Sequence, residues 1–114
     1  FEVGSANPAP HVALREAIET VESVGIPTIE ARISRLATRL AEGIPDDRLL
    51  GPSNPETGLV AIDVAEPETT VQRLADDGIV VRALPPVDAV RVSVHAVNTE
   101  SEVDRVLASL EPDL

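Results

Sequence analysis

Hydrophobic residues recur at helical spacing in two stretches near the start of the chain. The first stretch predicts an amphipathic helix over residues 10–24, which Gly25 ends. The second predicts a helix over about residues 29–40, with Thr28 as its N-cap and Gly43 just beyond its end. The apolar positions are Leu14, Ala17, Ile18 and Val21 in the first helix and Ile29, Ile33, Leu36, Ala37 and Leu40 in the second.

Three later stretches have the periodicity of β-strands. Residues 59–64 form a nearly unbroken apolar run, which is typical of a strand covered on both faces. Residues 79–83 form a second strand, and residues 89–95 alternate between apolar and polar positions as a third. The Pro85–Pro86 pair predicts a tight turn between the last two strands, so we expect these strands to be antiparallel. Leu49–Leu50 is the candidate start of a short fourth strand.

Two shorter helices complete the pattern. One begins at Pro67 and ends before Gly78, and its expected buried side is Val71, Leu74 and Ala75. The other ends at Pro112 and begins at Thr99, which forms an S/T-x-x-E capping box with Glu102. The predicted fold is therefore α/β, of the two-layer α+β type: a small, mainly antiparallel sheet of three to four strands with about four helices packed on it.

The composition limits the classes of function that are open to the chain. It has 114 residues, a hydrophobic fraction of 43% and no cysteine, which indicates one small domain without disulfides or thiolate chemistry. The formal net charge of −11 argues against a nucleic-acid partner, because little could neutralise a phosphate backbone. No apolar run is long enough for a membrane helix and no signal-peptide pattern opens the sequence. We therefore expect a cytoplasmic protein without a membrane partner.

Two further features of the composition bear on function. All nine basic residues are arginine, so the chain cannot supply an amine nucleophile or a Schiff base. The sequence starts at Phe1 rather than methionine, which suggests a piece of a longer protein. The strong acidity has two interpretations that the sequence leaves open: a salt-tolerant surface of the kind found in halophiles, or an acidic surface for a partner.

Candidate chemistry is concentrated on the strand predicted over residues 89–95. Because the side chains of a strand alternate, Arg91, Ser93 and His95 share one face. These three groups can bind an anion, and the arginine fork suits a carboxylate. An ordinary solvent-exposed sheet face would carry the same residues, and the sequence leaves both interpretations open. Arg82, at the end of the preceding strand, is either a second anion contact or a solvated side chain.

The remaining polar residues give weaker signals. A glycine and Ser5 precede the first helix, where backbone N–H groups can hold a phosphate, although Ser5 or Asn7 can instead cap that helix. His11 and His95 do not form a metal-binding signature. Ser93 has no base beside it in the sequence. The sequence therefore predicts no catalytic residue and no metal site within this chain.

Four segments, in order and at matching spacing, resemble the C-terminal part of the class V aminotransferase family. These are fold type I pyridoxal-phosphate enzymes that include cysteine desulfurases, selenocysteine lyases and epimerase-like members. The resemblance covers essentially the whole chain, although no single motif is specific. The segments are FEVGSAN at residues 1–7, GIVVR at 78–82, RVS at 91–93, and NT at 98–99 followed by EVD at 102–104.

The resemblance implies a role as the small C-terminal domain of such an enzyme. Residues 1–9 would form the lead-in segment and residues 10–114 the domain, with a large pyridoxal-phosphate domain and its cofactor lysine upstream. Arg91 matches the arginine that binds the α-carboxylate of an amino-acid substrate, and Arg82 matches an arginine near the substrate entrance. Ser5 matches the hydroxyl that reaches the cofactor phosphate, typically across the interface of a homodimer.

One departure from the family pattern narrows the expected chemistry. Cysteine desulfurases carry a nucleophilic cysteine on a loop between the positions of Arg82 and Arg91, whereas residues 83–90 here are short and contain no cysteine. An aminotransferase, a lyase or an epimerase therefore fits better than a persulfide-forming enzyme. The chain alone should be inactive. The alternatives are a free-standing, non-catalytic module for dimerisation or protein binding, and a small-domain relic that regulates a separate enzyme.

Overall fold

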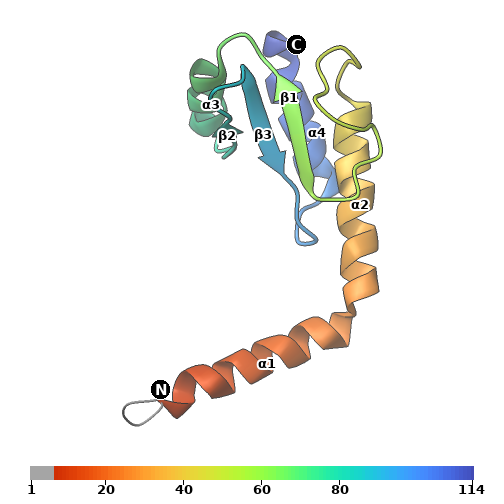
Figure 1. Ribbon diagram of the computed structural model, residues 1–114, viewed down its shortest axis with the longest axis vertical. Coiled ribbons are helices and arrows are strands. Elements are labelled where there is room, and N and C mark those ends of the chain that lie inside the picture. Colours follow the sequence, from red (N-terminus) through yellow and green to blue (C-terminus); the bar gives the residue numbers. More distant parts are fainter. Residues whose placement is uncertain (1–6) are drawn as a thin grey trace.

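The computed structural model describes residues 7–114 and has the element order that the sequence predicts (Figure 1). Two long helices come first, and a small sheet with two further helices follows. The elements are α1 (Pro8–Val24), α2 (Ile26–Glu42), β1 (Leu59–Asp63), α3 (Pro67–Asp76), β2 (Arg82–Ala83), β3 (Ala89–Ser93), α4 (Glu100–Leu110) and a 3-10 helix (Glu111–Asp113).

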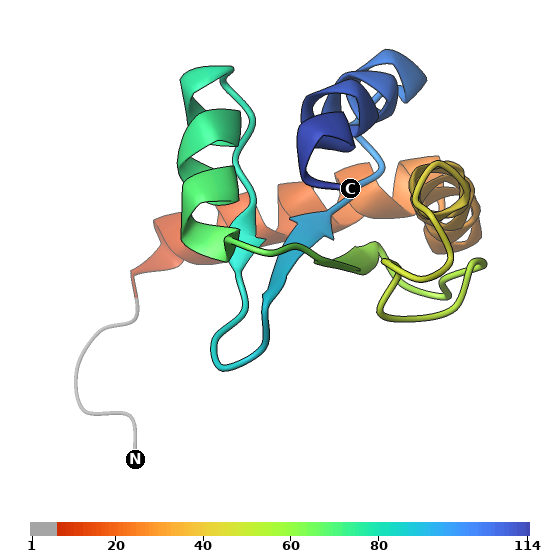
Figure 2. The same ribbon diagram turned by 90° about the horizontal axis from the view of Figure 1, so that it is seen from above.

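The three strands form one antiparallel sheet in the order β1-β3-β2. On the central strand β3, Arg91 lies between Ala61 of β1 on one side and Arg82 of β2 on the other. Helices α2, α3 and α4 lie on one face of this sheet, and no helix within residues 7–114 covers the other face (Figure 2). The two-layer α+β prediction is therefore confirmed, including the antiparallel pairing of β2 and β3.

The hydrophobic core lies between the sheet and these three helices. Strand side chains alternate, so every second residue of β1 and β3 points into the core. Each of the three helices contributes leucine side chains that are completely buried. The central members of the core are Leu36, Leu40, Val60, Ile62, Leu74, Val90, Val92 and Leu110.

Strand β2 is shorter than the strand predicted over residues 79–83. The backbone N–H of Ile79 donates to the carbonyl oxygen of Leu74 at 2.8 Å, which ties this part of the chain to the end of α3. Val80 next to it is 91% exposed. Regular pairing with β3 therefore starts only at Arg82.

Strand β3 also ends early, at Ser93, so the prediction of a strand reaching His95 is wrong. The Asn98 side-chain oxygen accepts the backbone N–H of His95 at 2.8 Å, and this contact bends the chain toward α4. The candidate fourth strand is reduced to one bridge between Leu49 and Ile62.

Two predicted details of the helices are wrong. Helix α2 begins before Thr28, because Pro27 has the fixed φ angle that suits the first helical turn. In α3, Ala75 is exposed, whereas Thr70 is buried and its hydroxyl donates to Asp113 at 2.9 Å. A hydrogen-bonded threonine can occupy a core position that an apolar pattern does not reveal.

The prediction that β1 is covered on both faces is wrong for the described residues. Val60 and Ile62 are buried, but Leu59 is 53% exposed and Ala61 is only half-buried. Within residues 7–114, one face of this apolar run is therefore open.

Helix α1 stands apart from the rest of the fold. It meets α2 at Gly25, whose φ of +90° suits glycine, and extends away from the sheet (Figure 1). The structure buries none of its residues, although its length and amphipathic pattern match the prediction. Within the described range, no helix is both long enough and apolar enough to cross a membrane.

Candidate functional site

The open face of the sheet carries the residues that the sequence singles out. Alternation places Arg91 and Ser93 of β3 on this face, with Leu59 and Ala61 of β1 on one side of them and Arg82 of β2 on the other. Polar and apolar groups therefore lie side by side on a surface that no described helix covers.

Arg91 carries the one buried hydrogen-bond donor on this face that lacks an acceptor among the described residues. Its Nε is buried and has no hydrogen-bond partner among the described residues. Among the described residues, Arg91 is also the only charged one that lines a cavity of about 130 Å³, whose other walls are mainly apolar. A buried guanidinium nitrogen without an acceptor is unfavourable, which favours an anionic ligand from outside these residues. The apolar walls are Leu49, Leu50, Pro52, Pro55, Leu59 and Ala61.

Arg82 lies directly opposite Arg91 in the register of β2 and β3. Residues opposite each other in an antiparallel pair have their side chains on the same face, with Cβ atoms about 4.5–5.5 Å apart. Arg82 is exposed, and within residues 7–114 it has no ion pair or side-chain hydrogen bond. The structure thus brings together the two arginines that the sequence separates by eight residues.

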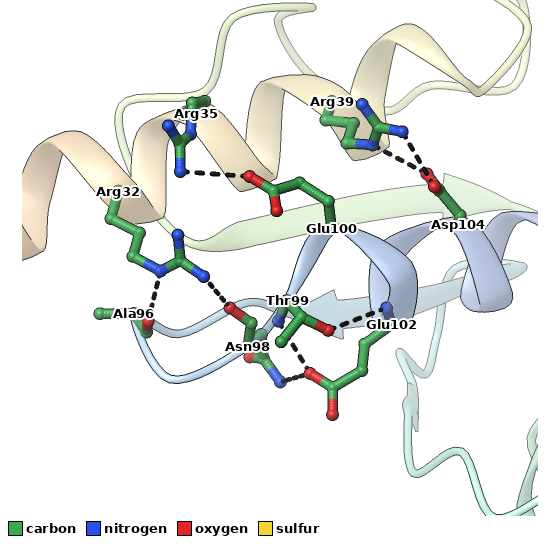
Figure 3. Close-up of polar contacts among 9 residues, drawn as sticks. All are labelled: Arg32, Arg35, Arg39, Ala96, Asn98, Thr99, Glu100, Glu102 and Asp104. Carbon is green, nitrogen blue, oxygen red and sulfur yellow. Dashed lines mark hydrogen bonds and ion pairs between the residues drawn. The ribbon is translucent and has the colours of Figure 1, made fainter.

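The other arginines are engaged by acceptors within the described chain. Figure 3 shows three of them on α2. Arg32 donates to the backbone oxygens of Ala96 and Asn98 at 2.7 and 2.6 Å. Arg39 donates to both carboxylate oxygens of Asp104, and these bonds lower the pKa of Asp104. The further acceptors are Glu16 and Glu19 for Arg15, Glu100 for Arg35, Asp63 for Arg48, Asp113 for Arg73 and the Asp77 carbonyl for Arg105.

Gly58 fixes how β1 lies against β3, and so how the cavity wall lies against Arg91. The backbone N–H of Val94 donates to the Gly58 carbonyl oxygen at 2.6 Å. A Cβ at Gly58 would collide with the Val94 carbonyl oxygen and press on Ile33. Only glycine permits this close approach of two backbones.

The other candidate residues do not join the arginine pair. Ser93 is on the same face but exposed at the strand end, and His95 lies beyond the strand. His11 is on α1, where its Nδ1 is 3.0 Å from the carbonyl oxygen of Asn7. Ser5 lies outside the described residues. Strand alternation therefore does not place His95 on the face of Arg91, because β3 ends at Ser93.

Another cavity, of about 210 Å³, lies between α4 and the segment after α3. Three of its polar residues already have partners: Asn98 bonds to Glu102, Glu102 also accepts the backbone N–H of Thr99 in the capping box of α4, and Arg105 bonds to the Asp77 carbonyl. Glu102 accepts the backbone N–H of Thr99, which lowers the pKa of the Glu102 carboxyl. This cavity therefore has less unmet bonding capacity than the one at Arg91.

The sequence analysis missed the apolar walls of the Arg91 cavity. Leu59 and Ala61 could have been found from strand alternation, because β1 pairs with β3 in a register that places them beside Arg91 and Ser93. The loop residues Leu50 and Pro55 carry no local signal for this position, since only tertiary folding brings the loop beside β1.

Comparisons with known proteins identify the family of the chain. The description "aminotransferase class-V" belongs to the family whose sequence profile matches residues 1–106. A solved complex of the cystine C-S lyase C-DES with its reaction product cysteine persulfide superposes with a TM-score of 0.66 and 27% identity, covering 72% of this chain and 23% of that chain. No curated protein matches the chain.

A second C-DES structure, a lysine-to-alanine variant with glycine covalently linked to its PLP cofactor, has a TM-score of 0.64 and 28% identity. It covers 70% of this chain and 22% of that chain, so the present chain spans less than a quarter of these relatives. The family profile, by contrast, accounts for nearly all of this sequence. The chain therefore belongs to the class V aminotransferase family.

Proposed function

We propose that this chain is the small C-terminal domain of a pyridoxal-phosphate-dependent enzyme and that Arg91 binds the α-carboxylate of its amino-acid substrate. The observation that carries the proposal is the buried, unpartnered Nε of Arg91 on the open face of the sheet. A carboxylate matches the arginine fork in geometry and charge, and would satisfy this nitrogen.

Two observations support the domain role. The solved relatives are more than four times as long as the part that this chain matches. Helix α1 also exposes an apolar stripe that includes Leu14, Ile18 and Val21, at 60%, 48% and 42% exposure. Contiguous apolar surface of this kind marks an interaction site. In the proposed enzyme, the large domain covers this stripe and the open sheet face.

The cofactor expected from the resemblance, pyridoxal phosphate, is supported by the family and by the C-DES structure that holds it. When bound, this cofactor supplies the electron sink for chemistry at the amino acid's Cα. The contribution of this chain is to hold the carboxylate at Arg91, which fixes the orientation of the Cα substituents. The cofactor lysine belongs to another part of the polypeptide, since this chain has none.

Several finer features of the proposal stay predictions. Ser5 is expected to contact the cofactor phosphate, within a lead-in segment over residues 1–9 that precedes the domain at 10–114. The enzyme is expected to be a cytoplasmic homodimer. Aminotransferase, lyase and epimerase chemistry all remain open, and the structural match to a C-S lyase favours the lyase branch.

The proposal is tested by substituting Arg91 in the full-length protein. We expect Arg91→Gln to weaken amino-acid binding by about 2–5 kcal/mol, the range for losing one member of a desolvated charge pair. Binding is measured by calorimetry. Arg35→Gln is the matched control, because Arg35 is exposed on α2 and pairs with Glu100 away from the open face. Equal affinity in the wild type and Arg91→Gln would remove Arg91 from this role.

The alternative function, a free-standing module for dimerisation or protein binding, makes a different prediction about the gene. The enzyme proposal requires an in-frame region of roughly the length of a large domain upstream of Phe1, containing a lysine that follows a strand. The module requires a start codon at or just before Phe1. Reading the upstream sequence distinguishes the two.

A further inference from the structure

The pairing of Arg82 with Arg91 is unusual for a sheet. Like charges directly opposite each other on one sheet face destabilise the strand pair. The other arginines of the described chain have hydrogen-bond or ion-pair acceptors. Arg39 of α2, for example, donates to Asp104. The two arginines that face each other are the ones that have no acceptor within residues 7–114.

The acid of β1 on the same sheet face does not relieve this repulsion. Asp63, on the same sheet face, is opposite Ala89 rather than opposite an arginine. Its carboxylate is engaged by Arg48 at 2.8 Å. The positive charge of the pair is therefore available to a ligand, in a chain whose formal net charge is −11.

One carboxylate does not satisfy both arginines well. A bidentate bond to a guanidinium uses both oxygens of a carboxylate. Arg91 is half-buried at the cavity, whereas Arg82 is exposed on the short edge strand β2. The two guanidinium groups thus offer an inner and an outer anion position on one face.

We infer that the substrate carries a second anionic group, and that Arg82 binds this group while Arg91 binds the α-carboxylate. The inference rests on the proposed function, because it takes the α-carboxylate position at Arg91 as given. The substrate class is then an amino acid with an acidic side chain. Arg82 is a specificity-determining residue for that side chain.

The test compares acidic amino acids with their amides, which have nearly the same shape and lack one charge. Calorimetry on the full-length protein gives the dissociation constants of L-glutamate and L-glutamine, and of L-aspartate and L-asparagine. In the wild type, the acid of at least one pair should bind about 10- to 100-fold more tightly than its amide, as a charge-assisted hydrogen bond predicts. The pair with the larger ratio indicates the length of the side chain.

Substitutions assign this preference to Arg82. Arg82→Gln should reduce the acid-to-amide ratio to near one, because it should weaken binding of the acid far more than binding of the amide. Arg82→Lys keeps the charge without the fork and should retain part of the ratio. Because Arg82 is exposed on an edge strand, neither change removes a core contact.

Each other outcome overturns a distinct claim. A wild-type protein that binds acids and amides equally, or an Arg82→Gln variant that weakens both equally, overturns the second anion position. If Arg91→Gln leaves all four affinities unchanged, the α-carboxylate role of Arg91 fails, and this inference fails with it. If Arg91→Gln weakens all four ligands but Arg82→Gln leaves the ratio intact, only the inference about the side chain fails.

Discussion

Helices α1 and α4 have similar amphipathic patterns and opposite surroundings. Helix α4 packs on α2 and α3 and buries Val103 and Leu110, while α1 buries no residue. Both have a side-chain N-cap, Asn7 in α1 and Thr99 in α4. The local chemistry that forms a helix is therefore present in both, and only α4 gains stability from packing.

This contrast shows what an apolar stripe does and does not specify. Periodicity identifies the face of a helix that is suited to burial, but it does not identify the surface that covers it. For α4 the covering surface is in the same domain. For α1 we propose the large domain of the full-length enzyme, and the open sheet face around Arg91 would be covered in the same way.

The largest effect should come from truncating a buried leucine of α4. Leu110→Ala removes a completely buried side chain and should destabilise the chain by about 2–5 kcal/mol. Ile18→Ala on α1, where the side chain is 48% exposed, should change stability by less than about 0.5 kcal/mol. Urea unfolding of the 114-residue chain measures both. If the two substitutions lowered the free energy of unfolding by similar amounts, α1 would have to pack within this chain. A larger loss from Ile18→Ala in the full-length protein would support docking of α1 on the large domain.

The next effect concerns the backbone in the packed region. Gly58→Ala forces a methyl group against the Val94 carbonyl and should cost about 1–3 kcal/mol. Gly51→Ala is the matched control, since no atom lies within 4 Å of its added Cβ. Denaturant midpoints of the two variants give the difference. Equal midpoints would mean that the backbones at Gly58 and Val94 can move apart without a loss of stability.

A smaller effect is expected at the helix caps. Thr99→Ala removes the acceptor for the Glu102 backbone N–H at 3.2 Å and should cost about 1 kcal/mol. Asn7→Ala removes the acceptor for Ala9 in α1, but fraying of an unpacked helix end has little effect on global unfolding. Hydrogen exchange should therefore show faster exchange in the first turn of α1 alone. If Asn7→Ala lowered the global free energy of unfolding as much as Thr99→Ala does, the contrast between an unpacked α1 and a packed α4 would be contradicted.

The smallest effect is a pH dependence at the α4 cap. The bond from the Thr99 backbone N–H lowers the pKa of Glu102 in the folded state. The stability that this provides is complete above the unfolded pKa of about 4.3 and is lost as the pH falls through the lowered folded value. Glu102→Gln should remove this part of the acid dependence. If the curves of stability against pH coincided for the wild type and Glu102→Gln, the lowered pKa of Glu102 would contribute nothing to the acid dependence.

Much of the fold follows from local signals. The capping box at Thr99 and Glu102, the end of α1 at Gly25 and the turn at Pro85–Pro86 were all predicted and are confirmed. Strand ends were less predictable. The backbone N–H of Ile79 donates to the Leu74 carbonyl oxygen, and that of His95 donates to the side-chain oxygen of Asn98. Apolar alternation cannot indicate either bond.

The candidate site divides in the same way. The sequence alone determined that Arg91 projects from a strand opposite its core-facing valines, because alternation is a property of the extended backbone. It also determined that α1 has an apolar face. Only the tertiary structure decided that Arg82 lies opposite Arg91, that the loop beside β1 closes a cavity at Arg91, and that the face of α1 stays exposed. The register of paired strands, and the surfaces that pack on a strand or helix face, depend on contacts between residues distant in sequence. No local pattern encodes such contacts.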